Sequence, residues 1–289
     1  MKYISKKEST LLEVLGEMFP DSSKSTLRAG LKEERVSVNG VTEKNSRAVV
    51  PEGAEVSLGH RKKFLPYGIK VIYDDDSLVV IQKPAGLLSV STDFESEFTA
   101  FSALKKYYAH KNVQVVHRLD RDTSGLMIFA LNKKAYDFFK IKFELHDVER
   151  QYCAIVEGIP VSEKGTWESY LYEDGNYVVH STHNTELGKQ AVTHYQVLGS
   201  TKYFAWMDFR LETGRKNQIR AQARDSGHPL VGDEKYGAKT KTKRLYLHAY
   251  RLTFEHPETK KRMIFSAPIP ESFYKLVKPR IDPLFVGKK

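Results

Sequence analysis

Residues 117–126 read HRLDRDTSGL, and the apolar run LMIFAL occupies 126–131. Two arginines, two aspartates and a histidine are crowded into the six positions 117–122, whereas the run that follows carries no charge. A short charge-free apolar run behind a Thr-Ser-Gly turn is typical of a buried β-strand. The stretch therefore predicts a buried strand that begins directly after a cluster of charges, of which at least one carboxylate is difficult to solvate.

The rest of the chain after Pro66 is dominated by similar strand patterns. Helical periodicity is confined to about 97–110, 133–146 and 215–226. The strand segments are short, rich in β-branched and aromatic residues, and separated by turn residues: GIKVIY (68–73), SLVVIQK (77–83), GLMIFAL (125–131), YCAIVEG (152–158), AVTHYQVLG (191–199), YFAWMDFRLE (203–212) and RLYLHAYRLTF (244–254). This arrangement predicts an α+β fold with a large, mainly antiparallel mixed β-sheet.

The first 60 residues form a separate pattern. Thr10 and Glu13 make a capping-box signature ahead of a leucine-rich helix, and a second helix begins near Ser23 or Ser25. The strand RVSVNG then ends in an Asn-Gly turn. The basic, aperiodic stretch HRKKFLP at 60–66 is typical of a linker. We predict a small α+β domain at 1–60, a linker at 61–67 and a large domain at 68–289.

Composition limits the classes of protein that fit. Cys153 is the only cysteine, which excludes an intramolecular disulfide and fits a reducing compartment. No segment has the pattern of a signal peptide or the length of a membrane span, so we expect a cytoplasmic protein. The net charge is +10, and residues 214–289 hold 18 Lys+Arg against 7 Asp+Glu. Such uneven positive charge indicates either a polyanion-binding surface or a basic surface that serves solubility.

Several cofactor and metal motifs are absent. The chain has no GxGxxG, GxxxxGK[ST], CxxC or HExxH sequence. His180 and His183 lack a third ligand in sequence, and Cys153 lies in an apolar strand. We therefore predict neither a metal site nor a cofactor.

Two charged clusters remain as candidates for chemistry. Asp120 is flanked by Arg118 and Arg121, whose charges favour the ionised form of a desolvated carboxylate. An ionised carboxylate of this kind is a competent nucleophile or base, but the same residues also make an ordinary loop-pinning ion network. In the second cluster Lys216, Arg220 and Arg224 are spaced to share one face of the helix predicted after Gly214. That helix would bind phosphates or reach Asp120, or it is an ordinary amphipathic helix.

These motifs and their order resemble the RluA-type RNA pseudouridine synthases. The resemblance covers nearly the whole chain and rests on YDDDSLVVIQKPAGLLS (73–89), HRLDRDTSGLMIFALN (117–132), RQYCAIVEG (150–158), GKQAVTHYQVL (188–198), TGRKNQIR (213–220), GHPLVGDEKYG (227–237) and RLYLHAYRLTFEHP (244–257). SKSTLRAGLKEERVSVNG (23–40) resembles the helix–helix–strand part of an S4 RNA-binding domain.

The resemblance implies an enzyme that isomerises uridine in RNA to pseudouridine without a cofactor. It makes Asp120 the essential carboxylate, which either attacks C1′ or removes a proton from C2′. It pairs Arg220 with Asp120 and lays Tyr152 against the uracil, with a possible part for its phenol in proton removal from C5. Arg118 would fill the space that the flipped nucleotide leaves. His117 is expected to be a structural hydrogen-bonding residue.

The resemblance also implies how RNA is bound and which RNA is modified. Phosphate contacts are expected from Lys24, Arg28 and Lys32 of the S4-like domain, and from Arg118, Arg121, Arg215, Lys216 and Arg224 of the catalytic domain. Ribosomal RNA of the large subunit is the expected substrate, and a monomer the expected state. A tRNA pseudouridine synthase, or a non-catalytic RNA-binding or ribosome-assembly factor on the same fold, are the rival readings.

Overall fold

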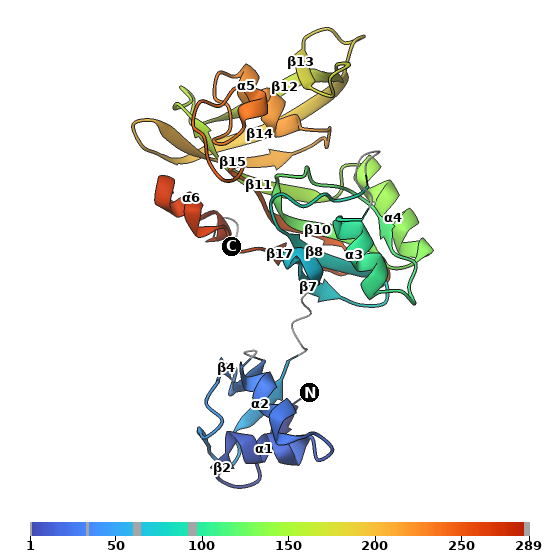
Figure 1. Cartoon of the computed structure of the whole chain (residues 1–289), viewed down its shortest axis with the longest axis vertical. Coiled ribbons are helices and arrows are strands. Elements are labelled where there is room, and N and C mark those ends of the chain that lie inside the picture. Colours follow the sequence, from blue (N-terminus) through green and yellow to red (C-terminus); the bar gives the residue numbers. More distant parts are fainter. Residues whose placement is uncertain (1, 33–34, 60–64, 92–96, 286–289) are drawn as a thin grey trace. The chain divides into compact units, whose positions relative to one another are not determined.

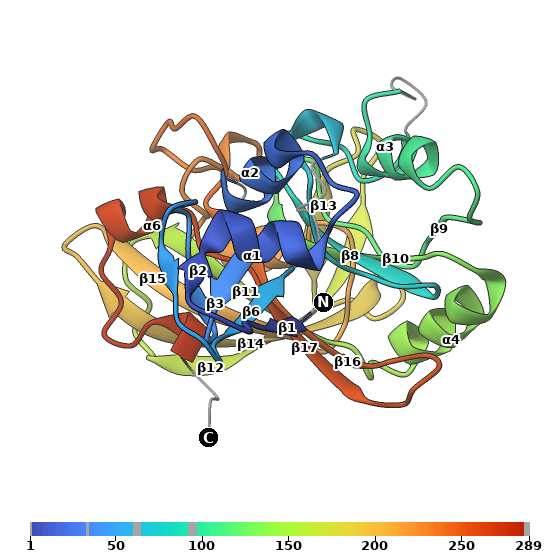
Figure 2. The same ribbon diagram turned by 90° about the horizontal axis from the view of Figure 1, so that it is seen from below.

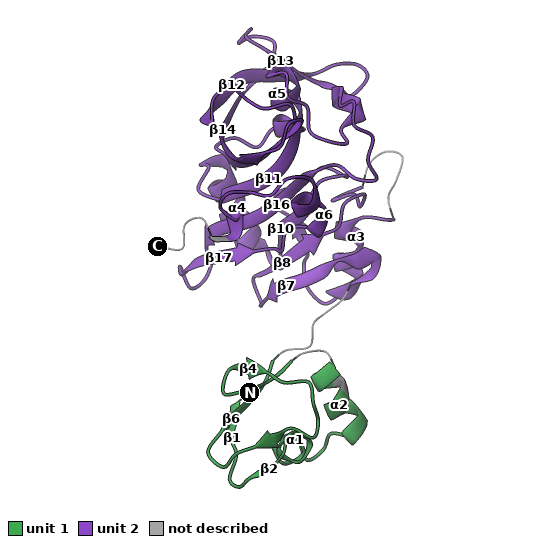
Figure 3. Cartoon of the chain, turned by 90° about the vertical axis from the view of Figure 1, so that its left-hand side faces the viewer, with its two compact units in different colours: residues 1–63 green, residues 64–289 purple. Residues whose placement is uncertain are grey.

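The computed structural model describes residues 2–32, 35–59, 65–91 and 97–285. The chain divides into two compact units, Met1–Lys63 and Phe64–Lys289 (Figure 3). The predicted linker at 61–67 falls largely on residues 60–64, which lie outside the described residues.

Unit 1 packs two helices, α1 (Leu11–Met18) and α2 (Lys24–Lys32), with short strands. Its core buries Leu11 and Leu15 of α1 with Leu27 and Leu31 of α2, the apolar positions that the helical spacing predicts. The predicted capping box is present, because Glu13 accepts hydrogen bonds from the backbone and the hydroxyl of Thr10. The strands are β1 (Lys2–Ile4), β2 (Ser9–Thr10), β3 (Val36–Val38), β4 (Val41–Thr42), β5 (Val49–Val50) and β6 (Glu55–Leu58).

Unit 2 is built on an eleven-stranded sheet (Figure 1). Nine strands follow the order β13-β12-β14-β15-β11-β16-β10-β8-β7, and the other two are β17, which pairs with β16, and β9, which pairs with β10. Among its described ladders only β10 with β16 is parallel, so the predicted mainly antiparallel mixed sheet is confirmed. The strands are β7 (Lys70–Asp74), β8 (Leu78–Lys83), β9 (Gln114–Val115), β10 (Ser124–Ala130), β11 (Glu149–Glu157), β12 (Lys164–Glu173), β13 (Val179–Thr182), β14 (Lys189–Ser200), β15 (Phe204–Leu211), β16 (Leu247–Glu255) and β17 (Arg262–Ser266).

Helices cover both faces of this sheet, which explains why β10 is buried along its whole length (Figures 1 and 2). On one face Met127 and Phe129 belong to the same core as α3 (Ala100–Tyr107) and α5 (Gln218–Asp225). On the other face Leu126 and Ile128 pack with α4 (Lys133–Glu144), and α6 (Glu271–Leu276) covers β11 and β15. A strand covered on both sides needs apolar residues at every position, as the run LMIFAL provides.

Gly125 allows β10 to approach β16 closely. Its φ is +126°, and a Cβ there would lie 2.2 Å from the carbonyl oxygen of Ala249. The residue pairs with Ala249 on one side and with Lys83 of β8 on the other. A residue with a side chain cannot occupy this position without separating the strands. The close approach fixes the start of β10 immediately after the charged turn at 117–122.

The sequence pattern predicts seven of the eleven strands of unit 2 and misses β9, β12, β13 and β17. β9 has only two residues, and most residues of β12, β13 and β17 are at least partly exposed. They lie toward the edge of the sheet or pair with only one neighbour, where one exposed face weakens the apolar signal.

Candidate active site

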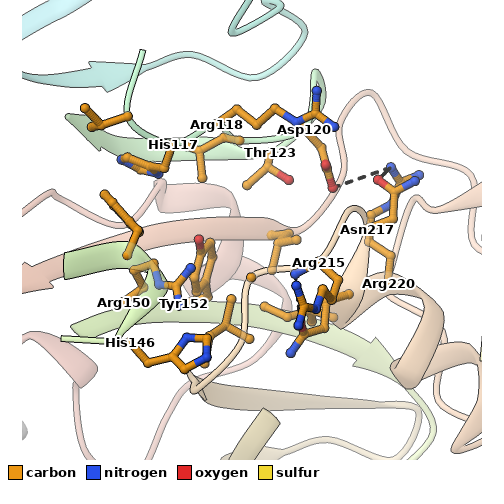
Figure 4. A pocket seen from close by; sticks show the side chains of 18 of the residues that line it. His117, Arg118, Asp120, Thr123, His146, Arg150, Tyr152, Arg215, Asn217 and Arg220 are labelled. Atoms are coloured by element: carbon orange, nitrogen blue, oxygen red, sulfur yellow. Dashed lines mark hydrogen bonds and ion pairs between the residues drawn. The ribbon is translucent and has the colours of Figure 1, made fainter. Parts of the chain in front are cut away.

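A cavity of about 480 Å³ opens on the face of the sheet that α5 covers. Four segments far apart in the chain line it: the charged turn with one residue on either side (116–123), the end of α4 with β11 (143–152), the β15–α5 connection with the start of α5 (211–220), and Leu247 of β16 (Figure 4). Asp120, Tyr152 and Arg220, which the resemblance groups together, all line this cavity.

Asp120 presents its carboxylate to the cavity, with 27% of its side chain exposed. Burial raises the pKa of Asp120, while the charges of Arg220, Lys83 and Arg118 lower it, and the net direction is upward. Of the two flanking arginines, Arg118 thus favours the ionised form as the sequence predicts, whereas Arg121 lies beside Asp122, and burial outweighs the cations. The result is a carboxylate that is more basic than an ordinary aspartate and therefore better suited to attack or to accept a proton.

Arg220 lies between two carboxylates rather than beside one. Its Nη1 is 3.9 Å from the Oδ2 of Asp120, whereas its Nε and Nη2 each donate to Asp233 at 2.7 Å. Its Nη1 also donates to the Asn217 side chain at 3.2 Å, and its guanidinium lies 4.8 Å from the centre of the Tyr236 ring. The prediction that Arg220 pairs with Asp120 is therefore only half of the arrangement, because the bidentate partner is Asp233.

Asp233 and Asn217 complete a buried network that the sequence did not reveal. The side chain of Asp233 is 1% exposed, and Asn217 donates from its Nδ2 to the hydroxyl of Tyr236 at 3.0 Å. Each group in the network therefore has a polar partner, as buried polar groups require. An aspartate directly after the apolar PLVG at 229–232 was the available signal, because a carboxylate in such surroundings needs a cation.

Lys83 is a second cation that sequence reasoning missed. It is fully buried, and its ammonium donates to the carbonyl oxygens of Pro84 at 3.0 Å, Leu87 at 2.7 Å and Arg121 at 2.9 Å. Burial lowers the pKa of Lys83 to about 7, although Asp120 and Asp122 oppose that change. By bonding the carbonyl of Arg121, this side chain ties the turn next to Asp120 to the end of β8.

Tyr152 projects from β11 into the cavity and is 7% exposed. Burial raises the pKa of Tyr152, and the nearby Asp120 raises it too, while Arg150 lowers it. Arg150 lies in the same wall and donates to the carbonyl of Glu212 at 3.2 Å. A Cβ on Gly214 would lie 2.3 Å from the Nη1 of Arg150, so the glycine makes room for this guanidinium. The phenol is thus held neutral above a buried cation.

His117 has the structural role that the sequence predicts. Its Nε2 accepts a hydrogen bond of 2.9 Å from the backbone N–H of Ile128, and its ring stacks on Phe143. Burial, together with the charge of Arg150, lowers the pKa of His117 to about 3. A neutral imidazole whose nitrogen is already bonded to the backbone serves to hold the charged turn against β10.

The predicted basic stripe of Lys216, Arg220 and Arg224 is wrong. The helix α5 begins at Gln218 and not after Gly214, because Asn217 adopts a left-handed conformation with φ of 50°. Lys216 precedes the helix and pairs with Glu173 of β12, whereas Arg224 bonds Asp225 at 2.8 Å. Arg220 is buried in the network described above, so the three cations do not share an exposed face.

The other predicted RNA-binding residues differ in their positions. Arg118 and Arg215 are exposed and line the cavity, where the Nε of Arg215 donates to the carbonyl of Gln190 at 3.0 Å. Arg121 is exposed outside the cavity, with its Nε 3.4 Å from Asp122. In unit 1, Lys24, Arg28 and Lys32 are exposed along one face of α2, beside the face that buries Leu27 and Leu31.

Within the described ranges no three His, Cys, Asp or Glu side chains are grouped so that they could hold a metal ion. None of the helices in the described part of the chain is both long enough and apolar enough to span a membrane.

Comparisons with known proteins agree with this geometry. Residues 77–225 match the model of the family described as RNA pseudouridylate synthase. The ribosomal large subunit pseudouridine synthase D of Neisseria meningitidis is 32% identical over 287 residues, covering 91% of this chain and 76% of the relative. The protein of the same name from Pseudomonas aeruginosa is 32% identical over 286 residues, covering 90% of this chain and 88% of the relative.

Solved structures agree on the fold. Human RNA pseudouridylate synthase domain containing 1 superposes with a TM-score of 0.60 at 23% identity, covering 73% of this chain and 88% of that chain. The human protein named as domain containing 4 gives a TM-score of 0.59 at 24% identity, covering 70% and 89%. With the family model matched across the charged turn, β11 and the whole of α5, the chain belongs to the RNA pseudouridylate synthase family.

Proposed function

We propose that this pseudouridine synthase modifies ribosomal RNA of the large subunit, with Asp120 as the essential carboxylate. The observation that carries the assignment of Asp120 is the convergence of three distant segments on one cavity, which brings the carboxylate together with Tyr152 and Arg220. A protein that only binds RNA does not require a desolvated carboxylate beside a buried guanidinium, and this disfavours the non-catalytic alternative.

The reaction is an isomerisation, so uridine neither gains nor loses atoms and is neither oxidised nor reduced. The C1′–N1 bond of uridine breaks, the uracil turns, C5 bonds to C1′, and the proton on C5 moves to N1. Asp120 acts at the sugar, either by attacking C1′ or by removing the C2′ proton, and both roles require its ionised form. The cations around Asp120 stabilise that form and orient it.

The exposed arginines of the cavity support a role in extracting the target nucleotide. A uridine must leave its stack before its C1′ can reach a carboxylate recessed in a cavity. Arg118 stands beside Asp120 in the charged turn, and Arg215 lies on the opposite wall (Figure 4). In this proposal Arg118 fills the vacated space in the RNA, while Arg215 contacts a flanking phosphate.

The choice of ribosomal RNA is supported by the named relatives, which are ribosomal large subunit pseudouridine synthases over most of this chain's length. A cytoplasmic location follows from such a substrate, because bacterial ribosomal RNA is made there. A monomer is supported because one copy of the chain supplies Asp120, Tyr152 and Arg220.

The decisive experiment measures tritium release from unmodified transcripts that carry tritium at C5 of uridine. We expect release from a large-subunit ribosomal RNA transcript and little from a tRNA pool. Release from tRNA alone would overturn the choice of RNA while leaving the reaction intact, and no release from either RNA would overturn the proposed function.

Unit 1 is proposed to be an S4-like RNA-binding module that reads structured RNA through α2. Replacing Lys24, Arg28 and Lys32 by glutamine should weaken RNA binding about 10-fold at moderate salt, because each lost phosphate contact reduces counterion release. Filter binding with the same transcript measures the loss. Glutamine at Lys6, Lys44 and Arg47, which are exposed elsewhere in unit 1, removes equal charge and should have a much smaller effect. Equal losses in the two variants would contradict a role specific to α2.

Tyr152 is proposed to contact the uracil and to assist proton removal from C5. Replacing it by phenylalanine keeps the ring in the wall of the cavity but removes the hydroxyl. We expect tritium release to slow by about 10²-fold, as for the loss of an acid–base group. The melting temperature should change little because the ring remains packed. A variant that releases tritium at the normal rate would show that the phenol takes no part in the proton transfer.

A further inference from the structure

The loop at 237–245, GAKTKTKRL, contains three lysines that none of the roles above uses. Lys239, Lys241 and Lys243 are exposed, whereas the alternating Thr240, Thr242 and Arg244 are partly buried. Within the described part of the chain no carboxylate lies within ion-pair distance of these three ammonium groups. Other lysines of unit 2, such as Lys134 and Lys216, do have carboxylate partners.

Hydrogen bonds fix the conformation of this loop. The carboxylate of Glu157 accepts from the backbone N–H of Lys239 at 3.0 Å and of Thr240 at 2.6 Å. The hydroxyl of Thr242 donates to the carbonyl of Arg244 at 2.6 Å. A Cβ on Gly232 would lie 2.2 Å from that hydroxyl, so the loop packs directly on this glycine. These contacts fix alternate residues and leave the lysines between them pointing to solvent.

Both ends of the loop are bonded to the segments that carry the catalytic charges. Tyr236, immediately before it, contacts Arg220 through its ring at 4.8 Å. Arg244, near its end, donates to the hydroxyl of Ser124 at 2.7 Å, at the start of β10 just after the Asp120 turn. The loop therefore begins next to Arg220 of the cavity and ends on the opposite face of the sheet, where the guanidinium of Arg244 lies 5.2 Å from the centre of the Phe273 ring of α6.

We infer that Lys239, Lys241 and Lys243 bind successive backbone phosphates of the RNA strand that flanks the target uridine. Exposed ammonium groups at every second position, in a loop whose own sequence has no acidic residue, suit a ligand whose negative charges repeat along a chain. The assignment gives a location to part of the positive excess that the sequence concentrates after residue 213. It rests on the proposed function for the identity of the RNA, but its test does not depend on turnover.

The test replaces all three loop lysines by glutamine and measures binding of the large-subunit ribosomal RNA transcript at several salt concentrations. Loss of three phosphate contacts should reduce the slope of log K against log salt by about 2, and affinity at 0.15 M salt by roughly 10- to 100-fold. Arginine at the same three positions should restore both quantities. The matched control replaces Lys105, Lys106 and Lys261, which are exposed and outside the cavity.

Three outcomes separate the possibilities. A reduced slope in the glutamine variant alone, restored by arginine, supports the phosphate-binding loop. An unchanged slope, or the same change in the control variant, overturns it and leaves the lysines as a surface for solubility. A reduced slope in a protein that releases no tritium from any transcript would keep the loop assignment and reject the proposed function, so the two failures are distinguishable.

Discussion

Asp120→Asn is expected to abolish tritium release, with a loss of at least about 10⁴-fold, because the amide can neither attack C1′ nor accept a proton from C2′. The exchange keeps the size of the side chain and its place in the charged turn. RNA binding should therefore persist, since Arg118, Arg215 and the exposed lysines are untouched. The measurement pairs single-turnover tritium release with filter binding on the same transcript, and normal release would end the assignment of Asp120.

The same variant is expected to be more stable than the natural protein at neutral pH. Burial raises the pKa of Asp120, so the folded state prefers the protonated carboxyl more strongly than the unfolded chain does. Stability from this group is complete below the ordinary aspartate pKa and is lost as the pH rises through the raised value. Asparagine removes that loss, and each kcal/mol recovered corresponds to about 2–4 °C in melting temperature.

A pH series of melting temperatures separates this effect from a general improvement in packing. The advantage of the asparagine variant should be largest at neutral pH and should shrink in acid, where the natural carboxyl is also neutral. An advantage that persists unchanged in acid would show that the ionised carboxylate is not the source. Asp122→Asn is the matched control, because this neighbouring side chain is 43% exposed outside the cavity and should leave stability nearly unchanged.

Sequence patterns predicted the parts of this molecule that depend on local chemistry. The charge-free run after Gly125, the capping box at Thr10 and the leucines of α1 and α2 all follow from periodicity and burial. What brought Asp120, Tyr152 and Arg220 together was the family resemblance, because residues about 30 and 70 positions apart give no local sign of contact. From the residues alone, a loop pinned by an ion network is the favoured interpretation of the charged turn.

The errors and omissions concern long-range partners. The spacing of Lys216 predicts a place in a helical stripe, but the left-handed Asn217 delays the start of the helix until Gln218, so Lys216 lies outside it. Lys216 instead pairs with Glu173, which lies on a strand that the pattern missed. Lys83 at the end of an apolar strand and Asp233 after an apolar turn are buried charges that local patterns cannot pair. Burial of a charge can be suspected from its apolar neighbours, but its partner is set by the tertiary fold.

Arg220 and Asp233 give the second large effect. Replacing Arg220 by glutamine leaves Asp233 almost fully buried without its bidentate partner, a change that typically costs about 3–5 kcal/mol of stability. Chemical denaturation measures this loss. Combining Arg220→Gln with Asp233→Asn removes both charges and should recover a substantial part of it. A double variant as unstable as the sum of the two single variants would mean that the pair is not coupled.

The two single variants should also move the acidic limb of the kcat/KM profile in opposite directions. Arg220 is the foremost of the charges that lower the pKa of Asp120, whereas Asp233 raises it. Without Arg220 the pKa of Asp120 rises further, so the carboxylate becomes protonated at a higher pH. The acidic limb of the profile therefore moves to higher pH. Asparagine at position 233 removes a negative charge, which lowers the pKa of Asp120 and moves the limb downward.

This opposition distinguishes electrostatic control of Asp120 from simple damage to the fold. Both variants lose buried contacts, so a merely structural role would lower the rate in each without separating their pH profiles. The profiles are measured by tritium release under single-turnover conditions at a temperature where both variants remain folded. Limbs that move together, or that stay at the natural position, would show that Arg220 and Asp233 hold the α5 region in place without setting the basicity of Asp120.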